Sequence, residues 1–335
     1  MKKLVLSVSG GGALGIGPLQ FMTRIEKELG IKLCNVCEGY AGTSTGSIIA
    51  SGLWIGMSAK QLFDLYKKNL SDIFKPRKIK LTDSVLFKNI SKKDFSVRDL
   101  ALLLQENYYR YDNSALKKLL EKHFPYKMRR FKKPIFIPTT FMNGDSVEKV
   151  WDNNDEDTPQ SFAILTSCSA PTYFETVEKD GNEYCDGGLW ANDPIMVLES
   201  GIKRFCNDEE IDKKGKYNEK FAEGFKILSF NTGMVHPNKG PDGKNIVSWL
   251  FYMVDEWIAR TGNSNYFEAC ANIGAENIFR CAPEISKAYD MDDLNVIDDV
   301  VKKWDKYFDS REKKGDKKTV GQKVCEFIES TMEKK

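Results

Sequence analysis

Apolar runs that end in glycine turns dominate the first 54 residues of the chain. Residues 3–9 form a short apolar stretch that predicts a buried strand, and three glycines follow it directly. The next segment carries apolar residues at a roughly helical spacing, namely Leu19, Met22, Ile25 and Leu29. A second strand is expected over residues 36–41, followed by another glycine turn and an apolar helix over residues 47–54. Two such strand–turn–helix units in succession predict a parallel sheet in an α/β fold.

Three later stretches also predict strands, at residues 134–140, 147–151 and 226–230. Residues 76–133 lie before them, are rich in Lys, Phe and Tyr, and look mainly helical. This segment could form an inserted lid, or it could be a helical layer that covers the sheet. The sequence leaves both interpretations open.

The composition changes near residues 310–318 to a charged run that is typical of a solvated linker. Apolar residues then recur on one side of a predicted helix: Val320, Val324, Phe327, Ile328 and Met332. Such a helix could dock on its own domain, lie on a membrane surface or contribute to an oligomer. We therefore treat residues 311–335 as a charged linker followed by an amphipathic C-terminal helix.

Composition narrows the class of protein. Hydrophobic residues make up 41% and charged residues 29% of the 335 positions, a balance typical of globular proteins. The formal net charge of +2 gives no electrostatic reason to expect a nucleic-acid polymer as partner, although local lysine clusters still allow a membrane surface. We see no run of about 20 apolar residues that could span a bilayer, and the apolar run after Met1 is too short for a signal peptide.

The eight cysteines are too scattered for a disulfide scaffold. Cys34 and Cys37 form the one close pair, and they lack the second pair or nearby histidine that a zinc site needs. Reduced thiols are the simpler interpretation, and they fit a cytoplasmic protein.

Candidate chemistry centres on Gly42-Thr43-Ser44-Thr45-Gly46, which lies between a predicted strand and an apolar helix. A Gly-x-Ser-x-Gly in this position predicts a nucleophile elbow, because the two glycines permit the tight turn that exposes the serine hydroxyl. The helix that begins there also directs backbone N–H groups at developing negative charge. Without further context, a turn with no chemistry is the main alternative.

The context is the run Gly10-Gly11-Gly12-Ala13-Leu14-Gly15 after the first strand. Acyl transfer needs backbone N–H donors close to the oxyanion, and glycines expose them without obstruction. The run also matches the dinucleotide fingerprint Gly-x-Gly-x-x-Gly, but no acidic residue closes the second strand at the required distance. We therefore assign an oxyanion role to Gly10, Gly11, Gly12, Ala13 and Gly15.

A serine nucleophile needs a base, and the chain contains only two histidines, His123 and His236. The first lies at a lysine-rich helix end and the second in a loop rich in Pro, Gly and Lys, which are typical surface settings. A carboxylate can act as the base when burial makes it basic enough. Asp186 is the best candidate, because Gly187 and Gly188 let backbone and substrate approach its side chain.

Together these motifs resemble the patatin-like phospholipase family, which combines a glycine-rich loop, a Gly-x-Ser-x-Gly elbow and a distant Asp-Gly-Gly. They occur here in that order, at residues 10–15, 42–46 and 186–188, and residues 166–174 and 186–194 are also similar to family segments. The resemblance covers roughly residues 1–310. One departure is Leu14, where the family usually carries Arg or Lys.

The resemblance implies a three-layer α/β/α sandwich with a mainly parallel sheet, and a Ser44–Asp186 dyad that cleaves fatty acyl esters of membrane phospholipids. It implies no metal and no cofactor, and a cytoplasmic protein that works at the inner membrane face. Positional preference, oligomeric state and any small-molecule activator stay open.

Two alternatives remain at this point. A catalytically silent binding or regulatory module could keep the same fold, and the departure at Leu14 is its only support. An α/β-hydrolase with a histidine triad would need His123 or His236 beside Ser44.

Overall fold

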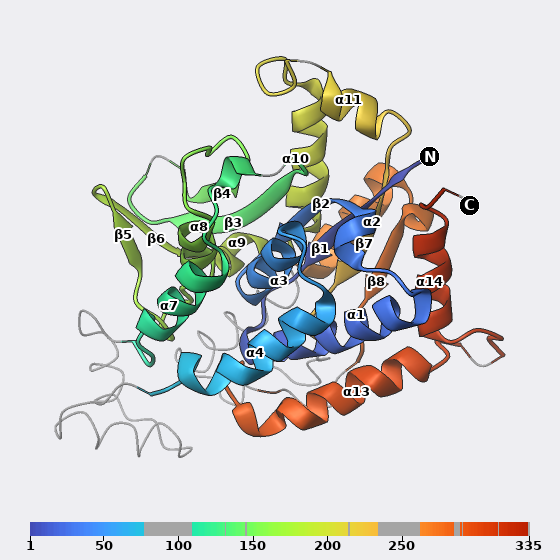
Figure 1. The fold of residues 1–335 in the computed structure, drawn as a ribbon, viewed down its shortest axis with the longest axis horizontal. Helices are drawn as coiled ribbons and strands as arrows, with labels where there is room; N and C mark the ends of the chain where they lie inside the picture. Colours follow the sequence, from blue (N-terminus) through green and yellow to red (C-terminus); the bar gives the residue numbers. More distant parts are fainter. Residues whose placement is uncertain are drawn as a thin grey trace, which may run out of the picture.

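Figure 1 shows a computed structural model of the chain, which describes residues 1–76, 109–130, 132–144, 146–213, 215–233, 262–284, 289, 291–313 and 315–333. Its central sheet has the strand order β5-β6-β3-β2-β1-β7-β8, and β4 pairs with β3. The strand bounds are β1 Lys3–Val8, β2 Cys37–Gly42, β3 Ile135–Phe141, β4 Glu148–Asp152, β5 Val177–Lys179, β6 Asn182–Asp186, β7 Phe225–Phe230 and β8 Ile278–Cys281. Strands β3, β2, β1, β7 and β8 run parallel, whereas β4, β5 and β6 pair antiparallel. The predicted mainly parallel α/β sheet is confirmed.

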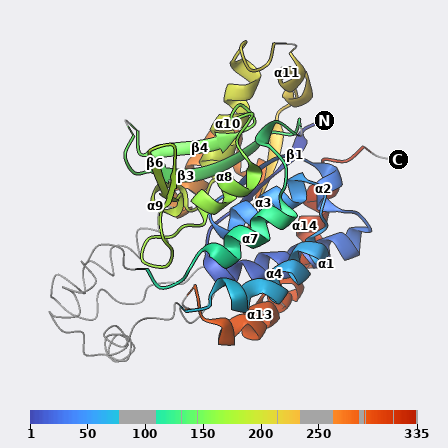
Figure 2. The same cartoon turned by 60° about the vertical axis from the view of Figure 1, so that its left-hand side comes forward.

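Helices cover both faces of this sheet, which gives the three expected layers (Figures 1 and 2). Alternate residues of β1 point to opposite cores, with Leu4 and Leu6 in one and Val5 in the other. The larger core includes residues of α1 Ile16–Leu29, α2 Leu33–Val36, α3 Thr45–Trp54, α4 Ala59–Ile73, α7 Ser114–His123, α8 Gln160–Ser167, α13 Ile297–Asp309 and α14 Val320–Glu329. The smaller core includes residues of α10 Ile195–Asn207, α11 Lys216–Phe221 and a helix over residues 262–273. The short α9 spans Gly188–Ala191, and η1 spans Gly12–Gly15.

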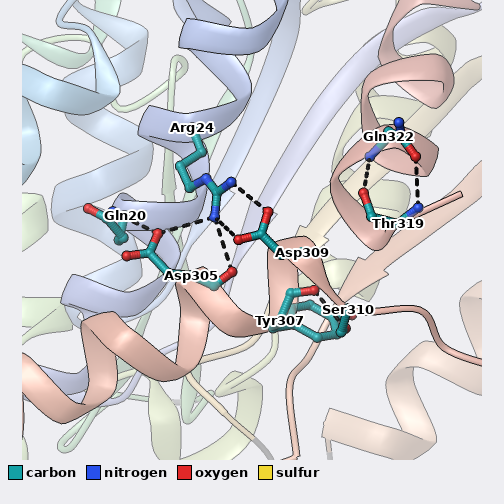
Figure 3. Close-up of polar contacts among 8 residues, drawn as sticks. All are labelled: Gln20, Arg24, Asp305, Tyr307, Asp309, Ser310, Thr319 and Gln322. Atoms are coloured by element: carbon teal, nitrogen blue, oxygen red, sulfur yellow. Dashed lines mark hydrogen bonds and ion pairs between the residues drawn. The ribbon is translucent and has the colours of Figure 1, made fainter.

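The C-terminal helices α13 and α14 pack on α1, and Figure 3 shows the polar contacts between α1 and α13. Arg24 on α1 donates to both carboxylate oxygens of Asp309, at 2.9 and 2.7 Å, and to the backbone oxygen of Asp305. Helix α14 begins at a capping box, in which the side chains of Thr319 and Gln322 each accept from the other residue's backbone N–H. Of the three interpretations of the C-terminal helix, this packing agrees with docking on its own domain.

The core accordingly covers most of the apolar side of α14, and Phe327 and Met332 are half-buried. Val320, Val324 and Ile328 are fully buried in the larger core. A membrane role for this stripe, which the sequence left open, is therefore not supported by the arrangement of the described residues.

The segment proposed as a lid is described only in part. Residues 77–108 and 131 lie outside the described residues. Helix α7 packs against α8 and α4, and Leu116 and Leu120 are buried there. This part of the segment therefore belongs to the helical layer. No described helix is both long and apolar enough to cross a membrane.

Candidate active site

The elbow at residues 42–46 forms where β2 ends and α3 begins, beside the end of β1. Val8 at the end of β1 pairs with Gly42 at the end of β2, so the glycine loop and the elbow start next to each other. Ser44 has φ 53° and ψ −127°, a backbone conformation that a residue with a side chain rarely adopts. A Cβ at Gly42 would lie 2.1 Å from the Gly46 oxygen, and one at Gly46 would lie 2.1 Å from the Val8 oxygen. Only glycine fits on either side of the strained serine.

Ser167 and Thr43 hold this turn in place. The Ser44 N–H donates to the Ser167 hydroxyl at 3.0 Å, and that hydroxyl donates to the Pro138 oxygen at 2.6 Å. The Thr43 hydroxyl donates to the Ala191 oxygen at 2.6 Å. No specific sequence signal marked Ser167, although this residue lies in the stretch 166–174 that resembles the family.

Asp186 lies at the end of β6, with its side chain against the nucleophile. Its carboxylate accepts from the Gly188 N–H at 2.7 Å. The Ser44 hydroxyl lies close enough to lower the pKa of the same carboxyl through hydrogen bonding. A Cβ at Gly187 would lie 2.3 Å from the Pro138 oxygen, so this turn also requires glycine. The structure thus brings together the two residues that the sequence predicted as a dyad.

The environment of Asp186 makes it a plausible base. Its side chain is buried, and desolvation raises the pKa of the carboxyl to about 7 despite the opposing bonds from Gly188 and Ser44. A carboxylate with a pKa near neutrality accepts a proton far more readily than an exposed aspartate does. Asp186 is therefore a stronger base than an exposed aspartate, which makes it the candidate base for the Ser44 hydroxyl.

Some of the backbone N–H groups predicted as oxyanion donors already donate to protein oxygens, and others do not. The Gly10 N–H donates to the Asn192 oxygen at 3.0 Å, and the Ala13 N–H donates to the Met291 oxygen at 2.7 Å. Within the described part of the chain, the N–H groups of Gly11, Gly12 and Thr45 donate to no protein acceptor. The structure therefore narrows the candidate donors in the loop to Gly11 and Gly12, and it adds the N–H that follows the nucleophile.

Gly12, Gly15 and Leu14 each pack closely against a neighbouring segment. Gly12 has φ 55°, and a Cβ there would lie 2.4 Å from the Met291 oxygen. Gly15 packs on the elbow, because a Cβ there would lie 2.7 Å from the Thr45 Oγ1. Leu14, which replaces the family's usual cation, packs against the larger hydrophobic core.

A buried ion pair lies behind the loop. Asp193 and Arg280 are in contact at 3.2 Å, and both side chains are more than nine-tenths buried. Burial raises the pKa of the Asp193 carboxyl to about 6, although Arg280 opposes this shift. The preceding residues, Ala191 and Asn192, accept the bonds from Thr43 and Gly10, so the pair anchors the segment that holds both loops.

A pocket opens at Ser44. Its walls are mainly apolar and include Ile48, Ile73, Phe74, Leu116 and Phe174. An apolar pocket beside a nucleophile can accept a hydrocarbon chain whose ester group lies at the serine.

The structure describes one of the two histidines, His123. His123 lies at the end of α7, where burial and the charges of Lys122 and Lys68 lower its pKa, and it does not line the pocket. His236 lies outside the described residues. Among the described residues, no group of three or more His, Cys, Asp or Glu could hold a metal ion.

Several proteins with sequences similar to this chain are named as phospholipases or as patatin-like proteins. An intracellular phospholipase A2 from Caenorhabditis elegans is 24% identical over 69% of this chain, which spans 19% of that protein. A cGAMP-activated phospholipase from Vibrio cholerae is 26% identical over 68% of this chain and 63% of its own length. Patatin-like protein 2 from Oryza sativa is 23% identical over 82% of this chain and 70% of its own length. The chain thus spans less than two thirds of the first two relatives.

The family assignment rests on a match that includes the glycine loop, Ser44 and Asp186. The sequence model of the patatin-like phospholipases matches residues 6–199, which is more than half of the chain. The protein belongs to the patatin-like phospholipase family.

Proposed function

We propose that this protein is a lipid acyl hydrolase that cleaves fatty acyl esters of membrane phospholipids through Ser44 and Asp186. The observation that carries the proposal is the strained Ser44 beside a buried carboxyl whose pKa is raised to about 7. The family assignment and the apolar pocket at Ser44 support the same substrate class.

The reaction begins when Asp186 accepts the Ser44 proton and the serine oxygen attacks the ester carbonyl. The oxyanion then lies among the N–H groups of Gly11, Gly12 and Thr45, which hydrogen-bond to its developing charge. Collapse of the tetrahedral intermediate breaks the bond to the alcohol, which takes the proton from Asp186 and leaves. Asp186 next takes a proton from water as the water oxygen attacks the acyl-enzyme. Collapse of this second tetrahedral intermediate releases the fatty acid, and the Ser44 oxygen takes the proton back from Asp186.

The test is lipid profiling of mixed phospholipid membranes after incubation with the wild type or with Ser44→Ala. The wild type should release fatty acids, and the variant should lose at least about 10³-fold in rate. Asp186→Ala should lose as much, and the double variant little more, because the two residues act as a unit. Ser51→Ala is the matched control, since Ser51 is a buried serine on the same helix whose hydroxyl has no partner in the described residues. Substantial turnover by Ser44→Ala would disprove the assignment.

Two rival functions are separated by different measurements. A silent binding module should not react with a fluorophosphonate probe, whereas an activated Ser44 should be labelled. A histidine triad predicts that His123→Gln combined with His236→Gln lowers the rate by about 10²–10⁴-fold. The dyad assigns neither histidine any chemistry, so we expect a change of no more than a few-fold in a folded double variant.

The site of action that we propose is the cytoplasmic face of a membrane. Helices α4 and α7, which provide Tyr66, Ile73 and Leu116 to the pocket, also carry several lysines: Lys60, Lys67, Lys68, Lys117, Lys118 and Lys122. These outnumber the acidic residues on the two helices, which are Asp64, Asp72 and Glu121. A basic surface around the pocket favours contact with anionic headgroups.

A further inference from the structure

The two halves of the candidate oxyanion hole come from separate segments, and a tyrosine from a third segment connects them. Gly11 and Gly12 belong to the loop after β1, while Thr45 belongs to the elbow after β2. Tyr66, on α4, donates its hydroxyl to the Gly12 oxygen at 2.5 Å and is also hydrogen-bonded to the Thr45 hydroxyl. One side chain therefore contacts the residues that carry two of the three free donors.

The direction of these bonds follows from the number of hydrogens. A tyrosine hydroxyl has one hydrogen, and the Gly12 carbonyl can only accept, so the Tyr66 hydrogen goes to Gly12. The Thr45 hydroxyl must then donate to the Tyr66 oxygen. Burial raises the pKa of Tyr66 further above its ordinary range, so the hydroxyl keeps its hydrogen throughout the working pH range.

The peptide unit between Gly12 and Ala13 is held at both ends. Its oxygen accepts from Tyr66, and its N–H donates to the Met291 oxygen at 2.7 Å. Because a peptide unit is planar, these two bonds fix its rotation. Gly12 itself has φ 55° and no side chain, so its backbone would otherwise have wide conformational freedom.

We propose that Tyr66 is a positioning residue for the oxyanion hole: its hydroxyl fixes the peptide unit that follows Gly12 relative to the elbow. This anchors the Gly12 Cα, and so limits the distance between the Gly12 N–H, in the preceding peptide unit, and the elbow donor. The proposal rests on the function proposed above. Donors help the transition state only when they lie about 2.7–3.1 Å from the oxyanion, so a small change in spacing lowers the rate. The ring lines the pocket, but the proposed role belongs to the hydroxyl.

The test is Tyr66→Phe, which keeps the ring and removes the hydroxyl. We expect kcat on a soluble short-chain ester to fall about 10- to 100-fold, less than or comparable to the loss of one oxyanion donor, while KM stays within about two-fold. The rate of fluorophosphonate labelling should fall in parallel, because phosphonylation of Ser44 uses the same donors. The pH profile should keep its midpoint, since the base is unchanged.

A second pair of variants tests the same link from the elbow. Thr45→Val removes the hydroxyl that donates to Tyr66 and should lower kcat similarly, whereas Thr45→Ser keeps a hydroxyl and should retain most of the activity. Combining Tyr66→Phe with Thr45→Val should add little, because both break one chain of bonds.

Tyr40→Phe is the matched control for loss of a buried hydroxyl. Tyr40 is fully buried, and its hydroxyl donates to the oxygens of Cys37 and Cys34. This variant should lose stability but keep the wild-type kcat. A Tyr66→Phe protein with wild-type kcat and labelling rate would overturn the inference, as would a rise in KM alone. A wild type that neither hydrolyses lipid nor reacts with the probe would instead disprove the proposed function.

Discussion

At the scale of single residues, the chemistry available to the candidate site depends on the burial of one carboxyl group, that of Asp186. Asp186 differs from the exposed aspartates of the chain because desolvation raises its pKa to about 7, whereas partners on the surface lower the pKa of Asp157 and Asp309. Burial therefore makes the carboxyl of Asp186 more basic, whereas the surface partners of Asp157 and Asp309 keep their carboxyls ionised. This difference has a direct consequence for the pH dependence of the reaction.

We predict that kcat/KM increases between pH 6 and pH 8 with a midpoint near 7. Asp186 accepts a proton only when it is ionised, so activity is present above the folded-state pKa and is lost as the pH falls through it. The measurement is hydrolysis of a soluble ester over pH 5–9, with folding monitored by circular dichroism. A rate that stays constant down to pH 5 in folded protein would show that Asp186 does not have this pKa.

The chemistry-bearing residues were more predictable than those that position them. Ser44 and Asp186 lie in glycine-flanked motifs, so the sequence indicated both, and the structure brings them together. Tyr66 was missed because a tyrosine on the apolar side of an amphipathic helix is typical of a core residue. Met291 and Asn192 accept hydrogen bonds through their backbone oxygens. Every residue has such an oxygen, so their residue types gave no signal.

At the scale of helices and strands, the sequence predicted an element correctly where its apolar run was long enough to show a regular spacing. The strands at residues 3–9, 36–41, 134–140, 147–151 and 226–230 are confirmed within a residue or two. Strand β5 was missed because its three residues are largely exposed and lack an apolar alternation. Strands β6 and β8 have four or five residues, so their pairing with neighbours decides their structure more than their sequence does.

Helix packing gives a prediction about Arg24, which joins α1 to α13 (Figure 3). Its guanidinium binds Asp309 through two hydrogen bonds and lies 4.1 Å from the centre of the Phe308 ring. Arg24→Met should lower the free energy of unfolding by about 1–2 kcal/mol, measured by urea denaturation. Lys60→Met removes an exposed pair with Asp64 and should change it by less than about 0.5 kcal/mol. Equal effects of the two substitutions would contradict a special role for the Arg24 contacts.

At the scale of the whole molecule, the two helical layers present different surfaces. The layer with α4 and α7 forms part of the pocket, whereas α10 and α11 cover the opposite face of the sheet (Figures 1 and 2). If the enzyme works on membrane lipid, the layer that carries the pocket must face the membrane. The lysines of α7 should then contribute to binding, and those of α11 should not.

Vesicle sedimentation tests this orientation. Binding should strengthen with the share of anionic lipid and weaken with salt. Lys117→Gln combined with Lys118→Gln should weaken binding about 30-fold, since each lysine near an anionic surface contributes about 1 kcal/mol. Lys213→Gln with Lys216→Gln, beside or on α11, is the matched control. Equal recovery in the supernatant for all lipid compositions would contradict membrane binding.

The buried carboxyl of Asp186 also has a thermodynamic consequence for folding. Its pKa is higher in the folded protein than in the unfolded chain, so the folded state holds the proton more tightly. Stability therefore declines as the pH rises from about 4 to about 7, and the loss is complete above that range. Asp186→Asn removes this ionisation and should make the inactive protein more stable at pH 8, by up to about 4 kcal/mol. The gain in Tm should disappear towards pH 4, whereas Asp72→Asn on the exposed side of α4 should show no such trend. An inactive variant that is more stable than its parent would mean that the fold is weakened where it performs its chemistry.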